Sequence, residues 1–303
     1  MRAAILVAPS LAVATATALL PAVFAADTAA AHASLPALFE EWGTIVYGNL
    51  DLSSSTLEGP ALVLGTADLV DFDVGGGRPC HPTAPALAVG GAAYGRHGVL
   101  KGRAALGRRS VLDDSVGLPC ADPADASRGV EVDGAAGVGT DTWALRLRHV
   151  TDSRAVCGVP PTGRVVVEDS VLKLYPAPPS AGDACVDVFV VRDPPSSLTS
   201  VQYFGRRRMV INYFFRSASW AGLDMATLVA ATTLHSYCGG GSLRLRDTEV
   251  SGSVLAPGLR VDSRASEIRG RLAVESITGQ AVVRYEAYTG VAPARLAAEA
   301  CAA

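Results

Sequence analysis

The chain has 303 residues, of which 26 are Lys or Arg and 29 are Asp or Glu, and its formal net charge at pH 7 is −3. So small a net charge creates no general field for gathering polyanions, and a nucleic-acid ligand is not expected. The only basic run, Arg206–Arg208, is typical of a solvated strand end.

The first 25 residues have the layout of a secretory signal. Arg2 is the only charge before an uncharged apolar stretch, Ala3 to Phe24, that ends in small residues. This order predicts a signal peptide over residues 1–25, cleaved after Ala25. A retained membrane anchor is the alternative, but two prolines make the stretch a weak spanning helix. Because no later stretch is apolar for long enough to span a bilayer, we expect a secreted, extracellular protein, free or associated with a cell surface.

After the signal, residues 26–33 are expected to form a flexible leader and residues 34–42 one short helix, with Ser34 as its N-cap. Beyond this point, short runs of alternating apolar and polar residues are separated by Gly, Ser, Asp and Pro. The clearest of these runs are Ile45–Tyr47, Trp143–Leu147, Arg164–Val167 and Ser242–Arg246. Such runs are typical of strands and turns, so the sequence predicts an all-β fold.

A recurring unit refines this prediction. An apolar residue is followed two positions later by Gly and then by apolar residues at alternate positions, at Gly59, Gly102, Gly252 and Gly270. The last two glycines lie 18 residues apart. This rhythm favours a β-solenoid, in which Gly allows tight turns between short inward-facing strands, and an irregular β-sandwich is the alternative.

In this solenoid register, the alternate side chains that follow the last two glycines point into the core: Val254, Ala256, Leu272 and Val274. Pro257 is expected at the turn that follows Ala256. One domain is expected over residues 34–290, followed by a short tail over 291–303, since no long linker divides the repeats. Residues 108–140 and 175–184 are expected to be loops or insertions. Residues 221–234 fit either a helix or a buried strand, because their periodicity does not decide between the two.

The cysteines support export as well. Six of them, an even number in a chain that looks secreted, predict three disulfides among Cys80, Cys120, Cys157, Cys185, Cys238 and Cys301. The sequence does not choose among their pairings. No two cysteines have the close spacing of a zinc site, so neither a metal nor another cofactor is expected.

Both ends of the chain resemble the choice-of-anchor A family, a bacterial and fungal surface-adhesion module. The opening match is Val46–Leu50 followed by Leu57–Gly65, and the closing match runs through Leu234–Cys238, Val250–Pro257 and Ile268–Leu272. The chain departs from the family pattern at Ser236-Tyr237 and at Gly258. The middle helix of the family is also not evident in residues 108–140. The resemblance implies an extracellular adhesive β-solenoid without a catalytic site, which binds an unidentified matrix or cell-wall glycan or protein.

A polysaccharide-cleaving enzyme is the alternative function. Asp113-Asp114 is an acidic pair of the kind that glycoside hydrolysis uses, and His97 or His149 is the candidate neighbour. A loop turn explains the pair equally well, and no Gly-x-Ser-x-Gly motif points to a serine hydrolase. Ice or crystal binding would need a ladder of threonines, and after the predicted signal only Thr140 and Thr142 have that spacing. We therefore predict a non-catalytic adhesive or structural protein.

Overall fold

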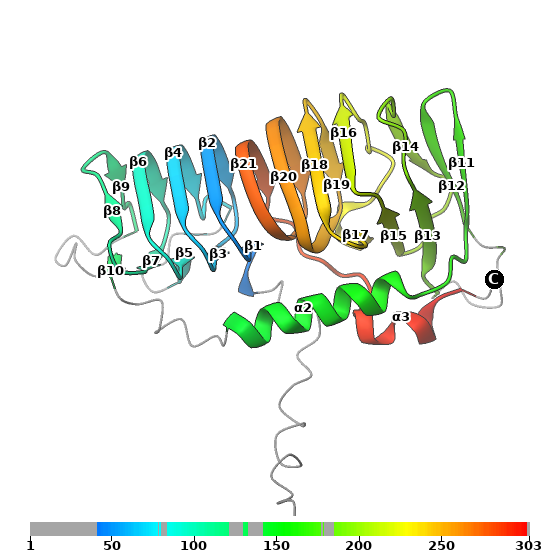
Figure 1. The fold of residues 1–303 in the computed structure, drawn as a ribbon, viewed down its shortest axis with the longest axis horizontal. Coiled ribbons are helices and arrows are strands. Elements are labelled where there is room, and N and C mark those ends of the chain that lie inside the picture. Colours follow the sequence, from blue (N-terminus) through cyan, green and yellow to red (C-terminus); the bar gives the residue numbers. More distant parts are fainter. Residues whose placement is uncertain are drawn as a thin grey trace, which may run out of the picture. The chain divides into compact units, whose positions relative to one another are not determined.

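Parallel strands stacked coil upon coil make up most of the protein, in a computed structural model that describes residues 41–77, 79, 84–120, 130–132, 142–176, 178 and 185–301 (Figure 1). This is the β-solenoid that the glycine rhythm predicts, and the β-sandwich alternative does not apply. In these ranges, no helix is both long and apolar enough to cross a membrane.

Each coil has three sides, as strand β20 (Ser253–Arg269) shows. Its pairing with β21 (Leu272–Arg284) shifts register between Ala256 and Arg260 and again between Ser263 and Ser266. These two shifts divide the strand into three straight segments, because the chain turns a corner at each. We call the sides A, B and C in the order in which the chain of β20 follows them.

Face A contains the first segments of β20 and β21 and eight separate strands: β1 (Thr44–Val46), β3 (Ala61–Val63), β5 (Pro85–Val89), β7 (Arg103–Leu106), β10 (Val130–Val132), β13 (Asp187–Arg192), β15 (Met209–Phe214) and β17 (Thr233–Tyr237). The remaining segments of β20 and β21 lie on faces B and C.

Faces B and C share three further long strands that bend between them: β2 (Leu50–Leu57), β4 (Ala67–Val74) and β6 (Ala93–Leu100). Shorter strands complete face B, namely β8 (Val111–Leu112), β16 (Ser217–Ala221) and β18 (Gly241–Arg246). Face C is completed by β9 (Val116–Gly117) and β19 (Glu249–Ser251).

Alternation along each segment separates the interior from the surface. Val254 and Ala256 of β20 belong to the core inside the coils, as do Leu272 and Val274 of β21. Leu255, between the two inward residues of β20, belongs to a second apolar cluster on the outside of face A. Face A is therefore apolar on both sides, which is the pattern of a sheet that another element covers.

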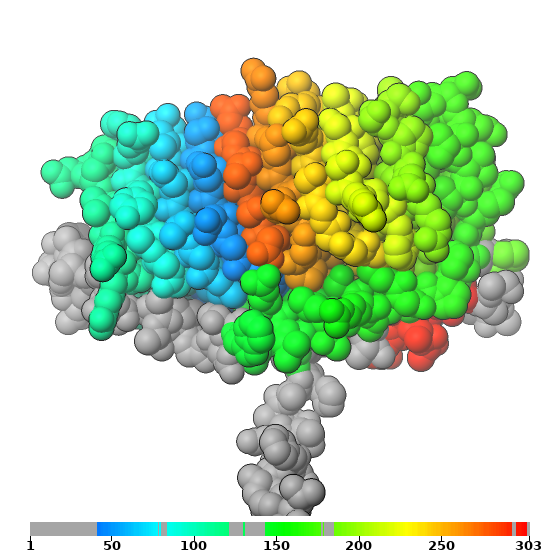
Figure 2. All heavy atoms as spheres, in the orientation of Figure 1, coloured from blue at the N-terminus to red at the C-terminus, as the bar shows by residue number. Residues whose placement is uncertain are grey.

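The coils are not stacked in sequence order. β1 pairs on one side with β3 and on the other with β21, so the first described coil lies against the last one (Figures 1 and 2). From β1 the chain builds coils outward to β10, crosses face A as helix α2 (Thr142–Cys157), and builds inward from β13 to β21. One end of the stack carries a small separate sheet of β11 (Arg164–Glu168), β12 (Val171–Tyr175) and β14 (Ser200–Tyr203). A 3-10 helix, η3 (Ala230–Thr232), and helix α3 (Pro293–Glu299) complete the elements.

Glycine is required at the corner between faces C and A. Gly252 and Gly270 have φ angles of 139° and 146°, which L side chains rarely adopt. A Cβ on Gly270 would lie 2.6 Å from the backbone of Gly252, because the two corners are stacked directly on one another. Gly102 has a similar φ of 149°, whereas at Gly59 the ring of Tyr285 fills the space of a side chain. Pro257 is buried at the next corner, between faces A and B.

Two local expectations were wrong or incomplete. Trp143–Leu147, predicted as a strand, is the first part of helix α2, whose Leu145 packs on face A. Residues 221–234 are mostly turns, with η3 and the start of β17 at their end, so neither a continuous helix nor a buried strand forms there. The helix expected over 34–42 lies largely outside the described residues, as do most of 175–184 and much of 108–140.

We predict that Leu272→Asp prevents folding. Leu272 has no exposed surface, and an unpaired buried carboxylate costs several kcal/mol, on the scale of a domain's whole stability of about 5–15 kcal/mol. The measurement is the yield of soluble protein and its thermal midpoint. Ser276→Asp, on the half-exposed side of the same strand and opposite Arg260, is the matched control and should change the midpoint little. Equal behaviour of the two variants would contradict the assigned register.

Candidate functional site

Face A is closed to large ligands where helix α2 covers it (Figure 1). Leu145 and Val156 of the helix pack with Leu234, Leu255 and other apolar residues on the outside of this face. At the C-terminal end of the helix, the buried side chain of Asn212 donates from Nδ2 to the carbonyl oxygen of Val156 at 2.9 Å. These contacts make the helix part of the fold rather than a movable cover.

Polar contacts hold the other half of the helix. Arg146 Nη2 lies 2.8 Å from Glu275 Oε2, and the hydroxyl of Tyr47 is hydrogen-bonded to Nδ1 of His149. His149 is fully buried, and burial lowers its pKa to about 4. His149, a candidate neighbour of the acidic pair, is therefore a neutral residue of the interface between α2 and the solenoid.

Disulfides fasten both helices. Cys157, the last residue of α2, is bonded to Cys238 directly after β17, and Cys185 is bonded to Cys301 after α3. The pairing is thus not sequential along the chain. Cys120 is disulfide-bonded as well, and Cys80 lies outside the described residues. The bonds close long loops, which favours the folded chain by restricting the unfolded one.

The acidic pair lies in a surface turn. Oδ1 of Asp113 accepts hydrogen bonds from the backbone N–H of Ser115, at 2.8 Å, and from its hydroxyl. The bonds from Ser115 lower the pKa of Asp113, whereas a general acid in glycoside hydrolysis needs a raised one. His97 stands nearby at the corner between faces B and C, where its backbone N–H donates to Ser115 Oγ at 2.7 Å. These contacts are those of a loop turn.

Metal binding has no support in the described ranges, where no group of three His, Cys, Asp or Glu side chains gathers. Thr142, one member of the predicted threonine pair, is the first residue of helix α2, and Thr140 lies outside the described residues. The pair therefore supplies no ladder on a strand face.

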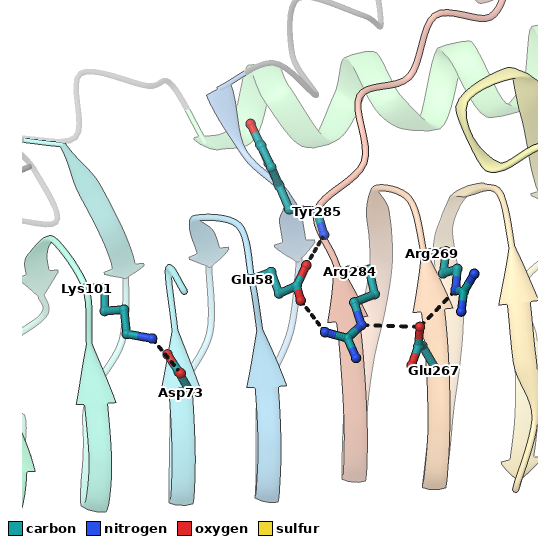
Figure 3. A network of polar contacts seen from close by, with 7 residues as sticks. All are labelled: Glu58, Asp73, Lys101, Glu267, Arg269, Arg284 and Tyr285. Atoms are coloured by element: carbon teal, nitrogen blue, oxygen red, sulfur yellow. Dashed lines mark hydrogen bonds and ion pairs between the residues drawn. The ribbon is translucent and has the colours of Figure 1, made fainter. Parts of the chain in front are cut away.

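Face C carries a ladder of ion pairs across adjacent coils (Figure 3). Arg284 of β21 pairs with Glu58, which directly follows β2, and its Nε lies 3.3 Å from Glu267 Oε1 on β20. Glu267 is also 2.9 Å from Arg269 Nε, which in turn lies 3.1 Å from Glu249. Further along the face, Lys101 and Asp73 form a separate pair at 2.8 Å. Opposite charges alternate here, so each of these bases on face C lies beside at least one acid.

Face B is charged but not balanced. One part, on β18 and β20, exposes four arginines and a single acid: Arg244, Arg246, Arg260, Arg264 and Asp262. Further along the same face, β2 and β4 expose Asp51 and Asp68, which lie directly opposite one another in the register. The alternation of Ser242–Arg246 is visible in the sequence, but which strand would lie beside it is not. The arginine cluster was therefore missed by sequence analysis.

The protein is therefore a parallel β-solenoid whose coils are stacked out of sequence order, with a helix on face A and strands exposed on faces B and C. Residues 36–285 match the model of the ice-binding-like adhesive domain family, and the chain belongs to that family. No curated protein matches it.

Three solved structures are similar at low identity. The DUF3494 domain of ice-binding protein 1 from Shewanella frigidimarina is 12% identical, with a TM-score of 0.35 and coverage of 84% of this chain and 97% of that one. A glycosylated ice-binding protein from an Arctic yeast is 13% identical, with a TM-score of 0.34 and coverage of 81% and 91%. One from the Antarctic ascomycete Antarctomyces psychrotrophicus is 9% identical, with a TM-score of 0.29 and coverage of 84% and 97%.

We predict that acid weakens the attachment of α2. His149 has a pKa near 4 in the folded protein and near 6.5 in the unfolded chain. The free energy of unfolding is therefore unaffected by this residue above pH 6.5 and falls as the pH drops from 6.5 towards 4, because the unfolded chain binds the proton first. The loss from this one residue is about 3 kcal/mol. Buried His235, whose pKa burial also lowers to about 4, adds to the slope.

Urea unfolding at pH 7.5 and pH 4.5 measures the effect. His149→Gln should lose less stability between the two pH values than the parent does, and His97→Gln, at an exposed corner, should lose as much as the parent. An unchanged slope in His149→Gln would show that this histidine is not buried in its neutral form.

Proposed function

We propose that this protein is a secreted adhesive domain that binds an extracellular polymer or protein through the exposed faces of its solenoid and does not turn over a substrate. The observation that carries the proposal is the arrangement of the faces. Helix α2 occupies face A, while faces B and C present rows of side chains on a rigid parallel sheet. Membership of an adhesive-domain family supports the same function.

Two features support export. The disulfides that hold α2 and α3 are of the kind that persists in oxidising compartments, and the first 25 residues have the pattern of a signal. The resemblance of both chain ends to the choice-of-anchor A family is part of this proposal, because that module is also an adhesive one. Surface attachment through another molecule is compatible with it.

A glycan-cleaving enzyme is less well supported. The turn contacts of Asp113 account for that carboxylate without a catalytic role, and His149 is buried under α2. Binding through a repeating face needs complementary shape and charge but no proton transfer.

Export predicts the mass of the mature chain. Secreted material should begin near Ala26 and should carry no alkylatable thiol, since the described cysteines are all bonded. Intact mass spectrometry, with and without alkylation under denaturing conditions, measures both properties. A retained N-terminus together with several alkylated cysteines would contradict secretion.

The function itself predicts saturable binding without product. The mature protein is screened against cell-wall glycans and matrix proteins, and each glycan is also assayed for released fragments. Binding should be unchanged in the variant Asp113→Asn, Asp114→Asn, because both residues belong to the corner turn between β8 and β9 rather than to a strand. Release of fragments that this double variant abolishes would support the enzyme instead.

A further inference from the structure

The arginine cluster on face B is a continuous surface. Arg244 and Arg246 alternate along β18 with buried leucines, and Arg260 and Arg264 alternate along β20 with buried residues such as Val261. All four side chains therefore leave the same side of two neighbouring parallel strands. Arg260 and Arg264 are about 13 Å apart along their strand, and adjacent strands are about 4.8 Å apart.

Two acids partly neutralise the cluster: Asp262 within it, and the exposed Asp247 directly after β18, whose charge also interacts with Arg246. Asp262 Oδ2 lies 2.7 Å from Arg246 Nη2 and 3.6 Å from Arg244 Nε, and the hydrogen bonds from Arg246 lower the pKa of Asp262, which keeps it ionised. In the described part of the chain, Arg260 and Arg264 make no ion pair. A net positive charge remains at the surface.

This imbalance opposes folding. Arg246 and Arg264 occupy the same register position on adjacent strands, and like charges placed directly opposite one another are destabilising. On face C of the same coils, Arg284 and Arg269 each lie between carboxylates. On face C, acids on adjacent coils thus neutralise the arginines, whereas on face B the adjacent coils supply too few acids to do so. A ligand that supplies the missing negative charges explains the difference.

Hydroxyl groups surround the arginines. Exposed or half-exposed side chains on the flanking positions of face B are Ser217, Ser219, Ser242, Ser276 and Thr278. A guanidinium group binds a carboxylate or a sulfate through two parallel hydrogen bonds, and a serine hydroxyl both donates and accepts. The surface is complementary to a polymer that carries repeated anionic groups and many hydroxyls.

We infer that this part of face B binds an acidic polysaccharide, whose carboxylate or sulfate groups pair with Arg260, Arg264 and Arg244. The inference rests on the proposed adhesive function and names its ligand class. Asp51 and Asp68 limit the ligand to the strands from β16 to β21, because they repel anions further along the face. The overall charge of −3 does not prevent binding, since charges beyond about 8 Å are largely screened at physiological ionic strength.

The test measures binding of the mature protein to immobilised alginate and heparin, which carry carboxylates and sulfates, with neutral dextran and poly-glutamate as comparison polymers. The double variant Arg260→Gln, Arg264→Gln should bind alginate or heparin at least about tenfold more weakly, a loss of about 1.4 kcal/mol. The control variant Arg269→Gln, Arg284→Gln removes the same charge from face C. It should keep the affinity within about twofold, because these arginines lie outside the cluster on face B, and it should still fold, because an exposed ion pair contributes little to stability. Added salt should weaken parental binding.

Each result decides between explanations. If the two double variants lose affinity for the acidic glycan equally, the total charge of the protein rather than face B attracts the polymer, and the inference is overturned. Binding of poly-glutamate as strong as that of alginate would overturn the assignment to polysaccharides. If the parent binds neither acidic glycan but saturates another polymer in the adhesion screen, the inference fails and the adhesive function stands. Thermal midpoints of both variants close to that of the parent ensure that the loss is one of binding.

Discussion

The ladder between β1 and β21 is the contact on which the rest of the solenoid depends. Thr44 of β1 is the register partner of Leu272 on one side and of Ala61 on the other. The first described strand is therefore inserted between the second coil of its own half and the last coil of the other half. Without this contact, each half would expose the backbone edge of a strand and one end of its apolar interior.

Helix α2 follows from the same constraint. The chain completes one half at β10 and must restart at the far end of the stack, so the connection has to run along the coils. As a helix it does so while covering the apolar outside of face A, where Leu255 would otherwise face water. Its contacts reach both halves, through Tyr47 before β2 and Asn212 on β15. The pairing partners are distant in sequence, which is a topology that folds slowly.

Local pattern was sufficient to predict the coils but not their order. The alternation behind Gly252 and Gly270 predicted inward-facing residues, and Leu272 and Val274 lie in the core, because side-chain direction along a strand depends only on its period of two. The insertion of β1 beside β21 had no local signal, since it arises from long-range pairing. Trp143–Leu147 alternates apolar and polar residues as a strand does, yet it forms a helix that bridges both halves. Tertiary packing decided the structure of that segment.

The same order determines the chemistry of the surface. In a parallel stack, a residue type that recurs with the coil period becomes a row, so two sequence segments such as Ser242–Arg246 and Leu259–Arg264 become one patch. The total charge of −3 does not reveal this positive patch, because most of the acids that offset the arginines in the total lie on other strands. Where a row meets its counter-charges, as on face C, it stabilises the stack. Where a row lacks enough counter-charges, as on face B, a net charge remains at the surface. Face A is covered in the region of α2. The position of the helix and the order of the coils together leave face B as the face with charge available for a partner.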